Sequence, residues 1–316
     1  MWLLYLPLVI PALAGAAARP LANRLEPRQA TWLLTSATVA LAGCSTAALA
    51  LLAAYAAARA PFLAAVGDYS QAVMRRGDPI SAAAGSAAAL ALASAAVAVV
   101  VMLRNWVRAL AESYRRAARL PADDGIVVVP GPAIEAYALP GWPGRIVVSG
   151  RLLDRLDDDR RAALIAHEQA HLDGRHHLFA AVARLAAAAN PLLLPVARSV
   201  EYTVERWADE RAAAVTGNRR MVAETIGQVA FLASPRRRRT TGISLGMIGS
   251  RALLRSAAWA GPVPRRVAAL LVAPPRRGRT ILLAACAAIV LLAGISALEA
   301  ASDLHALVEL AQAAGS

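Results

Sequence analysis

His167 and His171 lie four residues apart in the sequence His167-Glu168-Gln169-Ala170-His171. On an α-helix, residues four apart share one face, so both imidazoles can reach a single metal ion. Imidazole is a common zinc ligand, and a glutamate beside the pair is placed to take a proton from a metal-bound water. The pattern predicts a catalytic zinc site with Glu168 as the general base. The alternative is a helix whose histidines are only surface polar groups.

A second acidic pair lies downstream, in Glu205-Arg206-Trp207-Ala208-Asp209. A catalytic zinc ion needs a third protein ligand and keeps one position open for water. Glu205 is the predicted third ligand. Asp209, on the same helical face, is predicted to accept the second ring N–H of a ligand histidine. Glu201, one turn before Glu205, is the alternative third ligand.

The elements that must hold these residues are mostly helical. Asp157, Asp158 and Asp159 predict the start of the helix that carries the two histidines. Two β-branched runs, 126–129 and 145–149, predict short strands. The apolar segment 178–196 is broken at Asn190-Pro191. If it crossed a membrane once, Glu205 would lie on the opposite side of the membrane from His167 and His171. Either Glu205 is then not the third ligand or the segment does not cross, and we expect a helical hairpin. That hairpin either dips into the membrane or packs over the histidine helix.

Long apolar runs predict a membrane protein. Hydrophobic residues make up 58% of the 316-residue chain, and the mean hydropathy is +0.48. A spanning helix needs about 17–25 predominantly apolar residues. We therefore predict four transmembrane helices, in the following runs: 2–18, 31–58, 80–103 and 280–298.

Charge predicts the orientation. The net charge is +13, and arginine supplies all 34 basic residues. Most of them lie in 104–279, and arginine-rich loops stay on the cytoplasmic side. We therefore expect a three-span membrane region at 1–103, a cytoplasmic zincin-like helical domain with a small β element at 104–279, and a fourth span with a short extracellular tail at 280–316. With so many apolar runs, the basic charge indicates a lipid bilayer as partner, and no nucleic acid is expected.

The two zinc motifs, in a cytoplasmic domain held between spans, resemble the integral membrane gluzincins. Three spans, a zinc domain and a further span are similar to the BlaR/MecR-type antibiotic sensors. The spacing from His171 to His176 is more similar to the HtpX-type quality-control proteases. Only about 18 residues follow Leu298, so we expect no C-terminal penicillin-binding sensor domain. The resemblance implies a zinc-dependent metalloendopeptidase that cleaves a cytoplasmic or membrane protein, with a repressor as one type of target.

The expected reaction is hydrolysis of a protein or peptide substrate. The strand at 145–149 is predicted to pair with an extended substrate, and His176 and Tyr202 are candidates to stabilise the oxyanion. One alternative is a non-enzymatic membrane protein in which zinc only braces the helices. Another is a sensor whose protease domain responds to a membrane partner subunit.

Overall fold

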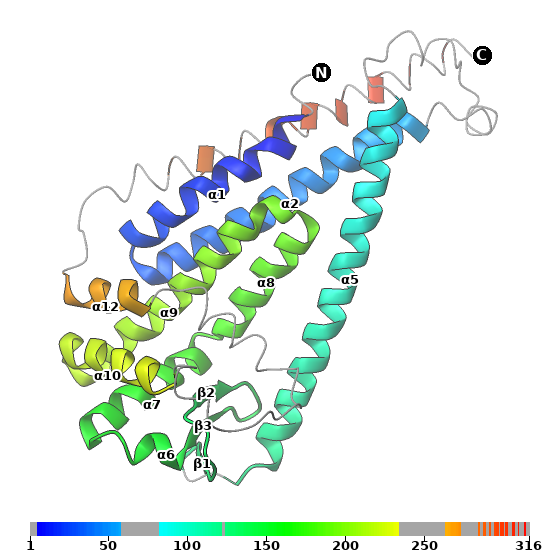
Figure 1. Ribbon diagram of the computed structural model, residues 1–316. Coiled ribbons are helices and arrows are strands. Elements are labelled where there is room, and N and C mark those ends of the chain that lie inside the picture. The colour runs from blue at the N-terminus through cyan, green and yellow to red at the C-terminus, as the bar shows by residue number, and fades with distance from the viewer. Residues whose placement is uncertain are drawn as a thin grey trace.

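Helices make up most of the protein, and a small sheet lies at one end of it (Figure 1). The computed structural model describes residues 5–57, 82–121, 124–233 and 263–272, with helical residues in ones, twos and threes between 284 and 313. The elements are, in chain order, α1 (Leu6–Arg24), α2 (Pro27–Ala57), α5 (Ala82–Arg119), β1 (Ile126–Val129), β2 (Ala136–Leu139), β3 (Arg145–Ser149), α6 (Gly150–Leu153), α7 (Asp158–Asp173), α8 (His176–Ala189), the 3-10 turn η2 (Pro191–Leu193), α9 (Leu194–Thr216), α10 (Arg219–Leu232) and α12 (Val263–Leu271).

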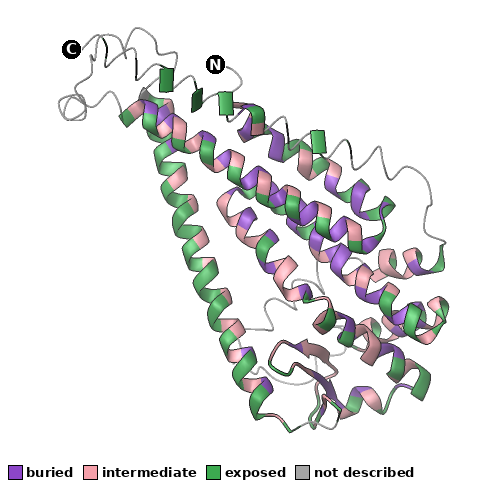
Figure 2. Cartoon of the chain, turned by 180° about the vertical axis from the view of Figure 1, so that it is seen from behind, coloured by how far each residue is buried: buried purple, intermediate pink, exposed green. Residues whose placement is uncertain are grey.

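The helices α1, α2, α8 and α9 pack side by side around one apolar core (Figures 1 and 2). Leu21 of α1, Leu34 and Leu41 of α2, and Val196 and Val200 of α9 are buried in it. The helix that carries the second acidic motif is therefore packed directly against the N-terminal apolar helices.

A bend at Asn190 joins α8 to α9 and makes the predicted helical hairpin. The side-chain oxygen of Asn190 accepts a hydrogen bond from the Leu192 N–H (3.0 Å). Its side-chain amide donates one to Ser45 Oγ in α2 (2.9 Å). Farther along, the hydroxyls of Thr31 and Thr203 lie 3.0 Å apart. These buried polar contacts fasten the hairpin to α2, and α9 returns alongside α8 toward the histidine helix.

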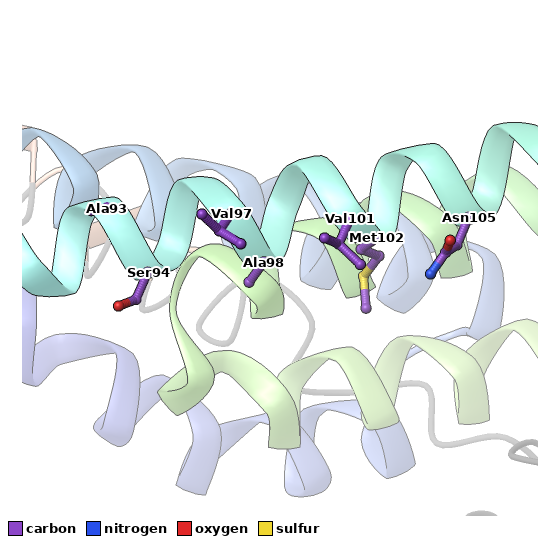
Figure 3. Close-up of a pocket in the computed structure, with 7 residues that line it drawn as sticks. All are labelled: Ala93, Ser94, Val97, Ala98, Val101, Met102 and Asn105. Atoms are coloured by element: carbon purple, nitrogen blue, oxygen red, sulfur yellow. The ribbon is translucent and has the colours of Figure 1, made fainter.

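Two of the described helices, α2 and α5, are long and apolar enough to cross a membrane. Only 6% of the most apolar window of α5 is buried within the protein, whereas a core helix of a soluble protein is mostly buried. A hollow along it is lined by Ala93, Val97 and Val101 (Figure 3), and its apolar character suits lipid contact. α1 does not meet the same criteria, and the predicted fourth span lies outside the continuously described residues. Four spans remain a prediction.

The three strands form one sheet in the order β1-β3-β2. β1 runs parallel to β3, and β2 runs antiparallel to it, with Ala136 opposite Val148. Because β3 is hydrogen-bonded on both sides, it has no edge to offer a substrate. The prediction that 145–149 pairs with an extended substrate is therefore wrong, and the edge strand in contact with α7 is β2.

The histidine helix α7 begins where the acidic run predicted. Asp157 is its N-cap and accepts a hydrogen bond from the Arg160 N–H (2.9 Å), with Asp158 and Asp159 in the first turn. Leu164 then packs with Ile146 and Val148 in the core beneath the sheet. Leu164 lies three residues before His167 and four before Glu168, so this packing anchors the motif-bearing side of α7 one turn before the motif.

Helices α2 and α5 approach each other closely at Gly85. A Cβ added there would lie 2.2 Å from the Ala56 Cβ. We expect Gly85→Ala to lower the free energy of unfolding by about 1–3 kcal/mol through overpacking. Gly43→Ala is the matched control, because nothing lies within 4 Å of that position. Thermal unfolding in detergent micelles measures both, and equal stability of the two variants would contradict this packing.

Candidate metal centre

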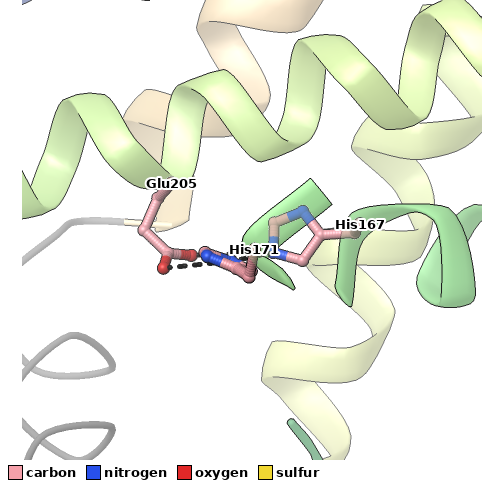
Figure 4. Close-up of side chains that lie close together, drawn as sticks. All are labelled: His167, His171 and Glu205. Carbon is pink, nitrogen blue, oxygen red and sulfur yellow. Dashed lines mark hydrogen bonds and ion pairs between the residues drawn. The ribbon is translucent and has the colours of Figure 1, made fainter. Parts of the chain in front are cut away.

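Two helices bring three donor side chains together. His167 and His171 come from α7 and Glu205 comes from α9, and the three point toward one another (Figure 4). The two Nε2 atoms are 3.2 Å apart, Glu205 Oε2 lies 3.8 Å from His167 Nε2, and Oε1 lies 3.6 Å from His171 Nε2. The structure thus gathers the three predicted ligands at one point.

The spacing and chemistry of these donors fit zinc. An ion at about 2.0–2.1 Å from each donor in a tetrahedral site sets the donors about 3.3 Å apart. The separation of the two Nε2 atoms is close to this value, and the two distances to Glu205, which run to different oxygens of its carboxylate, are somewhat longer. Two imidazoles and one carboxylate are a donor set of catalytic zinc sites, which leave the fourth position to water.

Asp209 lies beside the second ring nitrogen of His167. Its Oδ1 is 3.0 Å from His167 Nδ1, and the carboxylate is almost fully buried, with 1% of the side chain exposed. Burial alone would lower the pKa of His167, but the neighbouring Asp209 carboxylate outweighs burial and raises it. Asp209 thus stands where the sequence predicted, in position to orient His167.

His176 faces the second ring nitrogen of His171. The two Nδ1 atoms are 3.0 Å apart. If His171 bound a metal through Nε2, which faces Glu205, its proton would lie on Nδ1, and His176 Nδ1 is placed to accept it. Burial, and next the neighbouring His171, lower the pKa of His176 to about 3, so its ring is neutral. This contact gives His176 an orienting position rather than one at an oxyanion.

The turn between α7 and α8 lets His176 fold back beneath His171. Arg175 adopts a left-handed conformation there (φ 47°). A Cβ on Gly174 would lie only 2.3 Å from His176 Nε2. The histidine ring also packs against Trp207 at a tilt of 49°, with ring centroids 4.6 Å apart. Glycine at 174 is therefore required by the close approach of this ring.

Glu168 is buried beside the donors, with 9% of the residue exposed. Burial raises the pKa of its carboxyl above the ordinary value, opposed by His167, and the Ala138 backbone N–H donates to it from β2. A glutamate with a raised pKa is better suited to hold a proton between two steps. The edge strand thereby touches the predicted general base.

Arg266 is a residue of the centre that the sequence did not identify. It comes from α12 and contacts both Asp209 and Glu205 (2.6 Å and 2.8 Å at the closest). The only sequence signal was an arginine pair, Arg265-Arg266, before an apolar turn. Nothing in that pattern indicates a partner 57 residues away.

The other candidates are engaged elsewhere. Glu201 pairs with Arg184 (2.5 Å), so the alternative third ligand has a different partner. The ring of Tyr202 lies under the Arg265 guanidinium, 4.2 Å from it. Tyr202 therefore makes a structural contact rather than the predicted oxyanion contact.

Residues 101–186 match the model of Peptidase family M48. The match supports an M48-type zinc metallopeptidase. The matched stretch contains His167, Glu168, His171 and His176, and it ends before Glu205 and Arg266. No curated protein and no solved structure matches the chain.

Loss of the His176 acceptor should weaken zinc binding. We expect His176→Leu to reduce the affinity for Zn²⁺ about 10- to 100-fold, because His171 loses the group that fixes its ring. His176→Asn should stay within about threefold of the wild type, since its side-chain oxygen can accept in the place of Nδ1. Titration against a chelator measures both affinities. Equal affinities for the Leu and Asn variants would contradict the orienting contact.

Proposed function

We propose that this chain is a membrane-bound zinc metalloendopeptidase that cleaves a cytoplasmic or membrane protein. The observation that carries the proposal is the convergence of His167, His171 and Glu205 beside the buried carboxyl of Glu168. The M48 match over 101–186 supports the same class of enzyme. A site that only braced the helices would close the metal with four protein ligands. Among the described residues, three donors gather and a proton acceptor stands next to them, which favours catalysis.

Each residue of the metal centre has its own role in the proposed peptide hydrolysis. When bound, zinc supplies Lewis-acid polarisation of a carbonyl and of a water molecule. His167, His171 and Glu205 would hold the ion, while Asp209 and His176 keep the two imidazoles oriented. Glu168 takes the proton from the attacking water and delivers it to the leaving amine.

The edge of β2 is the proposed place for the substrate backbone. The Ser149 N–H donates to the Glu135 carbonyl (2.9 Å), so Glu135 and Ser149 form a hydrogen-bonded pair of the ladder between β2 and β3. Pairs alternate along an antiparallel ladder, so the backbone groups of Ala136 and Ala138 face away from β3. The Ala138 N–H already reaches Glu168. An extended peptide added along this edge would bring its carbonyl next to the general base.

The membrane placement rests on α2 and α5. The apolar part of α5 is exposed, and it is followed by arginines on the same helix. Four of these, Arg104, Arg108, Arg115 and Arg119, are exposed. Because arginine-rich flanks stay on the cytoplasmic side, we assign the metal centre to that side and expect regulated proteolysis there, with a repressor as one type of target.

Glu168→Gln should separate zinc binding from catalysis. The amide cannot accept the proton, so we expect proteolysis to fall about 10²–10⁴-fold, while zinc content stays near one per chain. The assay is cleavage of a casein or membrane-protein substrate by the protein in proteoliposomes. Glu201→Gln is the control, since its carboxylate pairs with Arg184 outside the centre. Unchanged cleavage by Glu168→Gln would refute the proposed enzyme.

Ala136→Pro tests the edge strand. It removes an N–H that faces away from β3, and proline is tolerated on edge strands. We expect KM to rise about fivefold, corresponding to about 1 kcal/mol for one lost hydrogen bond, with kcat little changed because uniform binding is lost. Zinc content and thermal stability should match the wild type. An unchanged KM with a folded variant would remove β2 from the substrate site.

A further inference from the structure

The α12 helix delivers one guanidinium to two carboxylates of α9. Arg266 Nε and Nη2 contact the two oxygens of Asp209 (2.8 Å and 2.6 Å), and Nη1 contacts Glu205 Oε2 (2.8 Å). Only 13% of the Arg266 side chain is exposed. The Arg266 guanidinium therefore bridges Glu205 and Asp209, which lie one turn apart on α9. Glu205 is the proposed zinc ligand, and Asp209 is the proposed partner of His167.

We propose that Arg266 is a positioning residue of the metal centre, which holds Glu205 and Asp209 in the geometry that zinc needs. The inference rests on the proposed zinc site. It makes α12 an obligatory part of that site, although this helix lies far downstream of both motifs and outside the stretch that matches family M48.

The need for such a residue follows from charge. Glu205 and Asp209 share one face of α9, and two neighbouring carboxylates in a poorly hydrated place repel each other. A divalent zinc ion and the Arg266 guanidinium together balance the charges of Glu168, Glu205 and Asp209. Arg266 donates to both oxygens of the buried Asp209 carboxylate and so compensates its charge. Asp209 therefore stays an anion that can orient His167.

Arg266 also leaves Glu205 with one oxygen for the metal. Its guanidinium takes Oε2, while Oε1 lies 3.6 Å from His171 Nε2. A guanidinium fork fixes the plane of the carboxylate that it binds, which a single point charge does not. The rotation of the Glu205 side chain is thus restricted before any ion arrives, and the entropy of ordering it is not lost on metal binding.

Contacts at both ends of α12 hold Arg266 in place. Arg219 of α10 donates to the carbonyls of Leu270 (2.9 Å) and Ala269 (3.1 Å) at the C-terminal end. Near its N-terminal end, Arg265 donates to the Asn23 side chain of α1 (2.6 Å). These contacts dock α12 on α9, α10 and α1 together.

A purely electrostatic effect would act in the opposite direction. A cation so close to the donors repels Zn²⁺, so if charge alone mattered, removing Arg266 would tighten zinc binding. Positioning predicts weaker binding. Lysine separates the two effects further, since it keeps the charge but lacks the fork.

The experiment measures Zn²⁺ affinity of the full chain in detergent micelles, by competition with a chelator, for wild type, Arg266→Gln and Arg266→Lys. Arg184→Gln is the matched control, because Arg184 pairs with Glu201, a carboxylate of α9 one turn before Glu205. We expect both Arg266 variants to bind zinc about 10- to 100-fold more weakly. Metal-free Arg266→Gln should also unfold at a lower temperature, because it leaves the buried carboxylates without their cation, whereas Arg266→Lys should unfold close to the wild type. The visible spectrum of the cobalt-loaded protein should change in parallel, and Arg184→Gln should behave as the wild type.

Three results would overturn the inference. The first is zinc affinity of Arg266→Gln equal to or tighter than that of the wild type. The second is full recovery by Arg266→Lys, which would reduce the role to charge. The third is an equal loss in Arg184→Gln. If Arg266→Gln does not fold, the zinc affinity of Arg266→Lys, which keeps the buried charge, tests the inference by itself. Failure of the wild type itself to bind zinc would instead refute the proposed function, so the two failures are distinguishable.

Discussion

Five acidic and imidazole side chains meet where α7 packs against α9, in a place largely closed to water. His167, His171, Glu168, Glu205 and Asp209 all gather there. Charged groups in such a place are tolerated only when each has a partner. Asp209 faces His167, His176 faces His171, and Arg266 spans the two carboxylates of α9. Elements as distant in sequence as α8 and α12 are held at the centre by this requirement.

The same requirement links the centre to the apolar helices. α9 contributes Glu205 near its middle, while its earlier turns lie in the core with α1 and α2. Thr31 meets Thr203, and Arg206 donates to the Ala22 carbonyl at the C-terminal end of α1 (2.7 Å). One face of a single helix therefore serves the metal centre, and other faces serve the N-terminal bundle.

The residues that could be predicted from the sequence are those whose relation is local. The four-residue spacings in His167–His171 and Glu205–Asp209 fix a common helical face, and Asn190-Pro191 fixes the bend that returns α9 to α7. The order of the strands is a property of distant segments, so the substrate edge was assigned to the wrong strand. Arg266 was missed for the same reason, because its partners lie 57 and 61 residues away. The membrane prediction is supported in part: α2 and α5 are long and apolar enough to be spans, while the fourth run lies beyond the continuously described residues.

The hairpin has a mechanical consequence. α9 runs without interruption from Leu194 to Thr216, and Glu205 stands about 16 Å along it from the bend, at 1.5 Å per residue. A helix of this length behaves as a stiff rod, and its near end is fastened at Asn190 to Ser45 of α2. If α2 tilted or rotated, α9 would therefore move with it as a rigid body. Glu205 would then shift relative to the two imidazoles of α7.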